Sequence, residues 1–225
     1  MNQPLAQWLD ANMLASPLFT EAITHRSAGG NNNERLEYLG DAVLGMIIAE
    51  HLFHTHKNAK EGDLSRLRAC LVRKETLAAI AKEQQLGEAI VLGPGELKSG
   101  GHRRDTILAD ALEAVVGAVY LTKGLDCARS FVLGLFHSRI ASLPHAEELK
   151  DPKTRLQEYL QSQNLPLPEY HLHEVSGESH AQHFTIRCHI RSPTIETIGE
   201  GSSKRTAAQE AARKALDLID DKHAD

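Results

Sequence analysis

The most informative segment of the chain reads Asn33-Glu34-Arg35-Leu36-Glu37-Tyr38-Leu39-Gly40-Asp41-Ala42-Val43-Leu44. Read as a helix at roughly 100° per residue, it places Glu34, Glu37 and Asp41 within about a 60° arc. The opposite side carries the apolar residues that such a helix buries, which are Leu36, Leu39, Val43 and Ile47. One edge of the predicted helix is therefore acidic, and its back is apolar.

Two features of this segment favour a role for the acids beyond simple solvation. A solvated acidic face is the usual explanation for three carboxylates on a helix, since like charges at this spacing repel one another. Here, however, the acids adjoin an apolar run, and Arg35 is the only cation among them. Gly40 also lies in mid-helix, where glycine costs up to about 1 kcal/mol relative to alanine unless something packs closely against it.

A second segment, residues 105–120, has the same character. Asp105 is predicted to cap the N-terminus of a helix. Asp110 and Glu113 lie one turn apart on that helix. The side opposite these acids is apolar and consists of Leu108, Leu112, Val115 and Val119. Two apolar-backed helices of this kind can pack so that their acidic pairs face each other.

Four clustered carboxylates require a cation, because they repel one another too strongly to stay ionised without one. All-oxygen sites rich in carboxylates suit hard divalent ions such as Mg²⁺ and Mn²⁺. Such a site is typical of metal-assisted phosphodiester hydrolysis. The two segments together predict a divalent-metal site formed by Glu37, Asp41, Asp110 and Glu113.

Length and composition indicate a globular protein of one ordinary or two small domains. The chain has 225 residues, of which 41% are hydrophobic and 24% charged. It has no apolar run of 18 residues and no secretory pattern at residues 1–6, so we expect no membrane association. Cys70, Cys127 and Cys188 are widely separated and odd in number, which favours a reducing, cytoplasmic location. The net charge of −5 does not by itself indicate a polyanionic partner.

The remaining segments complete the predicted order of elements. Short helices are expected around residues 5–13 and 18–24, and two more between residues 57 and 92. Residues 93–101 read as a flexible loop that lacks the Gly-Lys-Ser/Thr ending of a phosphate-binding loop, so no nucleotide cofactor is expected. His25 is more simply explained as a packed or capping residue than as a catalyst.

The C-terminal part of the chain changes character. Residues 144–152 are polar, contain two prolines and are predicted to be a linker. A helix at 153–162 is followed by period-two alternation between 169 and 200, which predicts three antiparallel strands. A helix from about Ser203 to Asp220 ends the chain, with its inward side formed by Ala208, Ala211, Ala215 and Leu218. The predicted fold class is an all-α domain followed by a small α+β domain of order α-β-β-β-α.

Several of these segments resemble blocks of one protein family. Residues 33–44, with Thr24-His25-Arg26-Ser27 before them, closely resemble the signature of bacterial ribonuclease III. Residues 61–65 and 107–114 are similar to its later blocks, in the same order and at similar spacing. Pro166-Leu167-Pro168-Glu169-Tyr170 and Gly201-Ser202-Ser203-Lys204-Arg205 resemble blocks of the double-stranded-RNA-binding domain.

The resemblance implies an endonuclease domain at 1–143, a linker at 144–152 and a double-stranded-RNA-binding domain at 153–221. It also implies a cytoplasmic homodimer that hydrolyses both strands of double-stranded RNA with Mg²⁺, for which Mn²⁺ can substitute. The products would carry 5′-phosphates and short 3′ overhangs. Ribosomal RNA precursors and other structured RNAs are the implied substrates.

The resemblance also assigns roles to individual residues. Glu37, Asp41, Asp110 and Glu113 would hold the metal, and we expect Asp41 and Glu113 to be the least replaceable. Glu34 and Glu61 form a second tier of the active site. The RNA-binding residues would be Gln157, Glu158, His180, Ser202, Ser203, Lys204 and Arg205.

Two positions depart from the family pattern. Tyr38 occupies a position that is usually Phe and that enters a pocket of the partner subunit in the family's dimer. Its hydroxyl needs a partner or water when buried. Thr206 stands where the family often has a third basic residue, which should lower the salt dependence of RNA binding by about one unit.

Two other functions fit parts of the pattern. A non-catalytic regulator that binds double-stranded RNA would keep the fold but lack cleavage, and the presence of all four acids argues against it. A helical hydrolase of small phosphoesters is the second alternative, but a small substrate needs no RNA-binding domain.

Overall fold

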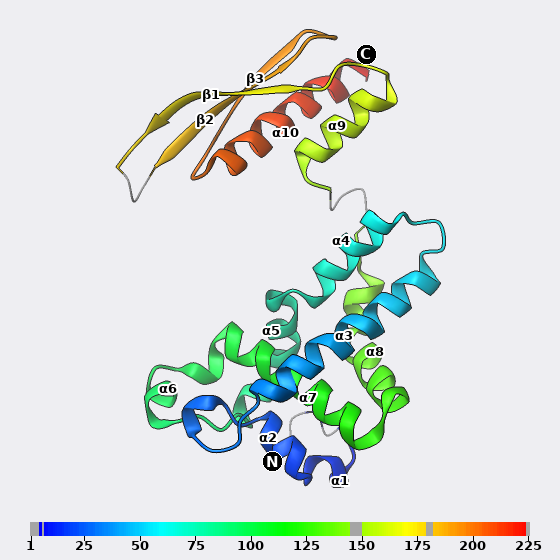
Figure 1. Cartoon of the computed structure of the whole chain (residues 1–225), viewed down its shortest axis with the longest axis vertical. Coiled ribbons are helices and arrows are strands. Elements are labelled where there is room, and N and C mark those ends of the chain that lie inside the picture. The colour runs from blue at the N-terminus through cyan, green and yellow to red at the C-terminus, as the bar shows by residue number, and fades with distance from the viewer. Residues whose placement is uncertain (1–4, 6, 145–149, 179–181, 224–225) are drawn as a thin grey trace. The chain divides into compact units, whose positions relative to one another are not determined.

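The computed structural model describes residues 5, 7–144, 150–178 and 182–223. The chain divides into two compact units, Met1–Pro144 and His145–Asp225 (Figure 1). The fold class expected from the sequence is confirmed, since the first unit is helical and the second combines helices with a three-stranded antiparallel sheet. None of the helices in the described ranges has both the length and the apolar character that a membrane crossing requires.

The first unit is built around one buried helix. Its α-helices, within the described residues, are α1 Ala11–Leu14, α2 Pro17–Ala22, α3 Glu34–Thr55, α4 Glu61–Val72, α5 Lys74–Glu83, α6 Pro94–Lys98, α7 Asp105–Lys123 and α8 Leu125–Ala141. Helix α7 packs against α2, α3, α5 and α8, and α3 runs alongside it in Figure 1. Every α7 residue from Ile107 to Val119 is buried except Asp110 and Glu113, which are half-buried. Two carboxylates thus interrupt an otherwise buried apolar helix.

Two glycines allow α3 and α7 to approach each other at their backbones. A Cβ atom at Gly40 would lie 1.8 Å from the carbonyl oxygen of Glu113, and one at Gly117 would lie 2.4 Å from that of Leu36. Neither position tolerates a side chain without movement of the backbone. The close packing expected at Gly40 is therefore present, and it lies directly beside the acidic residues.

Three details of the first unit differ from the sequence-based expectations. Residues 93–101 are not a loop throughout, because Pro94 provides a favourable first helical residue and α6 begins there. Asp105 is the first residue of α7 rather than its cap, which is Arg104. The helix expected around residues 5–13 is reduced to α1, whose first turn is capped by the carboxylate of Asp10 accepting from the Met13 N–H.

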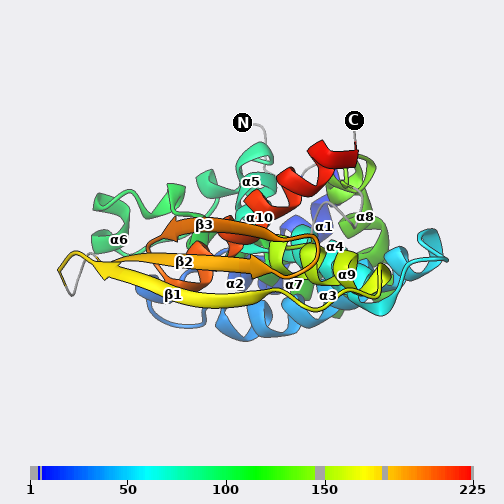
Figure 2. The same ribbon diagram turned by 90° about the horizontal axis from the view of Figure 1, so that it is seen from above.

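The second unit is a sheet covered on one face by two helices (Figures 1 and 2). Its elements are α9 Pro152–Ser162, β1 Glu169–Ser176, β2 His183–Ile190, β3 Ile195–Gly201 and α10 Lys204–His223. Strand order is β1-β2-β3, and α10 packs on β2, β3 and α9. The core between sheet and helices consists of Leu156, Leu160, Cys188, Ile190, Ile195, Ala211, Ala212, Ala215, Leu216 and Ile219. Leu218 was wrongly expected to face inward, for it is 44% exposed and Leu216 and Ile219 fill the core instead.

Candidate functional site: an acidic cluster and a basic helix terminus

Three carboxylates meet where α3 and α7 pack most closely. Glu37 comes from α3, and Asp110 and Glu113 come from α7. Each offers an oxygen atom, and these atoms all lie within 4.8 Å of one another. The contact at Gly40 and Gly117 brings the two helices close enough for this arrangement. Oxygen ligands at this spacing suit a divalent cation.

The electrostatics of the cluster show uncompensated negative charge. Burial, followed by repulsion from Asp41, Glu37 and Asp110, raises the pKa of Glu113 to about 8. Burial is also the largest cause of the raised pKa of Glu37, followed by repulsion from Asp110. A cation between these side chains would remove the repulsion. The residues present therefore fit a divalent metal ion.

Asp41 lies beside the cluster rather than within it. The side chain is exposed on α3, one turn after Glu37, and its carboxylate is not among the three whose oxygens converge. It is nevertheless close enough to contribute to the raised pKa values of Glu37 and Glu113. The structure thus brings three of the four predicted metal ligands together and places the fourth at their edge.

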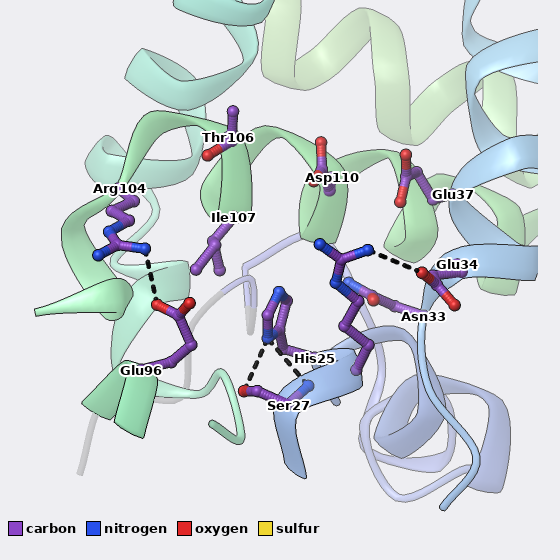
Figure 3. A pocket seen from close by; sticks show the side chains of 11 residues that line it. His25, Ser27, Asn33, Glu34, Glu37, Glu96, Arg104, Thr106, Ile107 and Asp110 are labelled. Atoms are coloured by element: carbon purple, nitrogen blue, oxygen red, sulfur yellow. Dashed lines mark hydrogen bonds and ion pairs between the residues drawn. The ribbon is translucent and has the colours of Figure 1, made fainter. Parts of the chain in front are cut away.

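A cleft of about 630 Å³ opens beside the cluster. Figure 3 shows Glu37 and Asp110 on one side of it and His25 and Ser27 on the other. The remaining lining residues are Arg26, Asn33, Glu34, Glu96, Arg104, Thr106 and Ile107. Glu34, a predicted second-tier residue, is exposed in this cleft and pairs with Arg26 at 3.4 Å. Arg104 pairs with Glu96 at 2.9 Å, which attaches α6 to the start of α7 and forms the far wall.

Sequence reasoning missed Asn33 as a residue of the cleft. Asn33 occupies the N-cap position of α3, where Asn usually caps a helix with its side chain, but here its side chain makes no capping hydrogen bond. The residue is only 2% exposed, and its Nδ2 atom has no hydrogen-bond partner among the described residues. A buried amide donor without an acceptor is costly, so Asn33 is an unusual residue in the wall of the cleft. No pattern in the sequence distinguishes it from an ordinary capping residue.

Glu61 and Tyr38 lie away from the acidic cluster of the same chain. Glu61 begins α4, accepts a hydrogen bond from Ser65 Oγ at 2.8 Å, and lines a hollow of about 430 Å³ between α3 and α4. The rest of that hollow is mostly apolar and is formed by Met46, Ala49, Glu50, Leu52, Phe53, Leu64, Ser65 and Arg68. Tyr38 is 82% exposed on α3, an unusual position for a large aromatic side chain.

The predicted RNA-binding residues of the second unit gather at two exposed places. Lys204 and Arg205 form the exposed first turn of α10, after Ser202, which is also exposed. Ser203 is committed to the helix, because its Oγ accepts from the Thr206 N–H at 3.1 Å. On α9, Gln157 and Glu158 are both exposed, and Glu158 forms an ion pair with Lys150. His180 lies outside the described residues.

Comparisons with known proteins cover both units. A family model described as Ribonuclease-III-like matches residues 16–140, and one described as Double-stranded RNA binding motif matches residues 152–219. The chain is 52% identical to Ribonuclease 3 of Shewanella amazonensis over 202 residues, which are 90% of this chain and 89% of that protein. It is 50% identical to Ribonuclease 3 of Vibrio cholerae over 202 residues, 90% of each chain.

Two solved structures of the nuclease domain of ribonuclease III from Campylobacter jejuni resemble the first unit. One matches with a TM-score of 0.57 at 38% identity and covers 64% of this chain and all of that chain. The other has a TM-score of 0.56 at 39% identity and covers 62% of this chain and 98% of that one. The latter is described as showing structural flexibility in a region involved in dimer formation.

Proposed function

The chain belongs to the ribonuclease III family, and from that premise we propose that it uses a divalent metal ion to hydrolyse both strands of double-stranded RNA. Family membership makes it an endoribonuclease that acts on double-stranded RNA. The proposal adds Mg²⁺ as the metal, with Mn²⁺ able to substitute, and products with 5′-phosphates and short 3′ overhangs. The observation that carries it is the convergence of Glu37, Asp110 and Glu113 within 4.8 Å.

We assign the acids separate tasks. Glu37, Asp110 and Glu113 would hold the ion, and Asp41 lies at their edge, where its exposed carboxylate can accept a hydrogen bond from the attacking water. A bound divalent cation would lower the pKa of water and stabilise the charge that develops on the phosphate. Asp41 and Glu113 remain the residues whose loss we expect to cost most. Glu34 would orient Arg26 beside the cleft through their ion pair.

The second unit would hold the RNA duplex. Lys204 and Arg205 stand at a helix N-terminus, where positive side chains oppose the helix dipole and stabilise the fold little. The same place offers free backbone N–H groups to a phosphate. Gln157, Glu158 and His180 would contact the minor groove, because A-form RNA is recognised through its 2′-hydroxyl and phosphate groups.

A homodimer would provide one cleavage site for each strand. Tyr38 is an exposed aromatic residue that an opposing subunit would bury, and the apolar hollow beside Phe53 is a recess of suitable character. Glu61 lines that hollow, which would bring it toward the partner's site. The nuclease task falls to residues 1–143 and RNA holding to 153–221, joined by the linker 144–152. Ribosomal RNA precursors in the cytoplasm are the proposed substrates.

The test is incubation of the purified protein with a labelled RNA duplex of about 30 base pairs, with and without Mg²⁺. We expect Mg²⁺-dependent cutting of both strands, with single-stranded RNA left intact. Glu113→Gln should bind the duplex without cutting it, whereas Glu75→Gln, at an exposed glutamate on α5, should cut normally. Tight binding without cutting by the wild-type protein, in Mg²⁺ and in Mn²⁺, would instead favour a non-catalytic regulator.

A further inference from the structure

The loop before α3 holds the ring of His25 in one orientation. The Ser27 backbone N–H donates a hydrogen bond to His25 Nδ1 at 3.2 Å, and Ser27 Oγ lies 2.8 Å from the same nitrogen. The Gly93 N–H in turn donates to Ser27 Oγ at 3.0 Å. Because a backbone N–H can only donate, Nδ1 must be an acceptor. The neutral ring of His25 therefore carries its proton on Nε2.

The protonated nitrogen faces the cleft. Figure 3 shows it on the side of the ring away from Ser27, toward the wall that carries Asp110. Within the described part of the chain, Nε2 forms no hydrogen bond. Burial is the largest cause of the raised pKa of Asp110, whose carboxylate lines the same cleft as His25. The ring thus presents a fixed and unused donor beside the acidic cluster.

On the side of the cleft opposite Glu37 and Asp110, the ring of His25 presents an N–H donor, and Arg26 also lines this cleft. Among the described residues, the Arg26 guanidinium forms one ion pair, to Glu34 at the long distance of 3.4 Å. A phosphodiester group has the opposite character, since its two non-bridging oxygens only accept hydrogen bonds and carry negative charge. A phosphate in the cleft would supply an acceptor for the His25 Nε2–H and for the Arg26 guanidinium.

We propose that His25 contacts the RNA directly, its Nε2–H donating a hydrogen bond to a non-bridging phosphate oxygen of the strand in the cleft. This inference rests on the proposed function and adds a substrate-binding role to the part that Nδ1 plays in shaping the loop. His25 would hold the phosphate from the side opposite Asp110 and Glu37.

Two amide substitutions separate the functions of the two ring nitrogens. His25→Asn places an amide oxygen near the position of Nδ1, so it can still accept from the Ser27 N–H but lacks the donor at Nε2. His25→Gln places an amide NH₂ near the position of Nε2 but loses the bond to Ser27. Both are to be made in the full-length chain, with cleavage of the RNA duplex and thermal unfolding measured for each.

We expect His25→Asn to unfold at the wild-type temperature but to lower kcat/KM for duplex cleavage roughly 10- to 100-fold, as the loss of one hydrogen bond to a charged group predicts. His25→Gln should unfold at a lower temperature yet regain part of the lost kcat/KM. The proposal is overturned if His25→Asn cleaves like wild type, or if the activity of both variants falls only in step with their stability.

A binding measurement distinguishes failure of this inference from failure of the proposed function. Glu113→Gln should bind the duplex without cutting it, and adding His25→Asn to that variant should raise the dissociation constant several-fold at fixed salt. This result would support the contact even if the wild-type protein cut no RNA. Equal affinity of the single and double variants would overturn the contact even if wild-type cleavage were efficient.

Discussion

Replacement of Gly40 by alanine is expected to push α3 away from α7. The new Cβ atom would lie 1.8 Å from the Glu113 carbonyl oxygen and 2.5 Å from its carbonyl carbon, whereas ordinary contact begins at 3.4 Å. The helices must therefore separate locally by about 1.6 Å, the difference between 3.4 and 1.8 Å. No side-chain rotation can relieve this overlap, because the obstructing atoms belong to the backbone.

The energetic balance of this substitution is unfavourable. Alanine in a helix interior stabilises the helix by up to about 1 kcal/mol relative to glycine. Overpacking of a close-packed interior costs about 1–3 kcal/mol and sometimes more, and a clash with backbone belongs at the upper end of that range. The net loss of unfolding free energy should be about 2 kcal/mol, which corresponds to a fall of about 4–8 °C in unfolding temperature.

The same displacement should disperse the acidic cluster. Glu113 would move with the carbonyl that the new methyl group displaces, while Glu37 stays on α3. Metal sites tolerate ligand displacements of only about 0.2 Å, so a shift several times larger should weaken Mn²⁺ or Mg²⁺ binding strongly. Metal titrations followed by thermal unfolding would measure both effects in one experiment.

Gly45→Ala provides a matched control on the same helix. A Cβ atom at Gly45 would meet nothing within 4 Å, so this substitution should stabilise the protein by about 0.5–1 kcal/mol and leave metal binding unchanged. The packing argument would be refuted if Gly40→Ala and Gly45→Ala unfolded at the same temperature and bound metal equally well.

Three further predictions concern charge and assembly. The pKa of Glu113 is about 8 in the folded protein against 4.5 in the unfolded chain, so the metal-free protein should lose stability as the pH rises from 4.5 to 8. Glu113→Gln should reduce this loss of unfolding free energy by about 1–2 kcal/mol, after allowance for the partial exposure of the side chain. Denaturant unfolding at several pH values in the presence of a chelator would measure it. Lys204→Ala should reduce the slope of log affinity against log salt by about one, as measured by duplex binding at several salt concentrations; an unchanged slope would exclude a phosphate contact. Tyr38→Ala should raise the dissociation constant of a homodimer about 30-fold in sedimentation experiments, because a buried aromatic anchor contributes about 2 kcal/mol to binding. Leu121→Ala, at an exposed position on α7, should leave that constant unchanged.

Local sequence patterns were sufficient for most of the elements. The period of the apolar residues identified α3 and α7 and the alternation in β2, because these patterns reflect which side of each element is buried. They failed where a local signal had two interpretations. Gly93-Pro94-Gly95 reads equally as a loop or as the start of a helix, and the ion pair of Glu96 with Arg104 stabilises the helical form.

Spacing in the sequence could propose the acidic cluster but could not establish its geometry. One-turn spacing put Asp110 and Glu113 on one edge of α7, and a mid-helix glycine indicated a close neighbour at Gly40. Which carboxylates converge depends on the angle and depth at which α3 meets α7. That packing brings Glu37 within 4.8 Å of the α7 pair and leaves Asp41 at the edge.

The sequence alone was thus enough for the family and the fold class, because both are encoded in residue type and local period. Only the tertiary structure revealed the buried Asn33 and the fixed tautomer of His25. The tautomer of His25 follows from its local hydrogen bond with Ser27, but the cleft that the ring faces depends on contacts between segments far apart in the chain, such as the bond from Gly93 to Ser27. Such contacts are decided by how packed helices position the loops between them, and a local pattern carries no record of those distances.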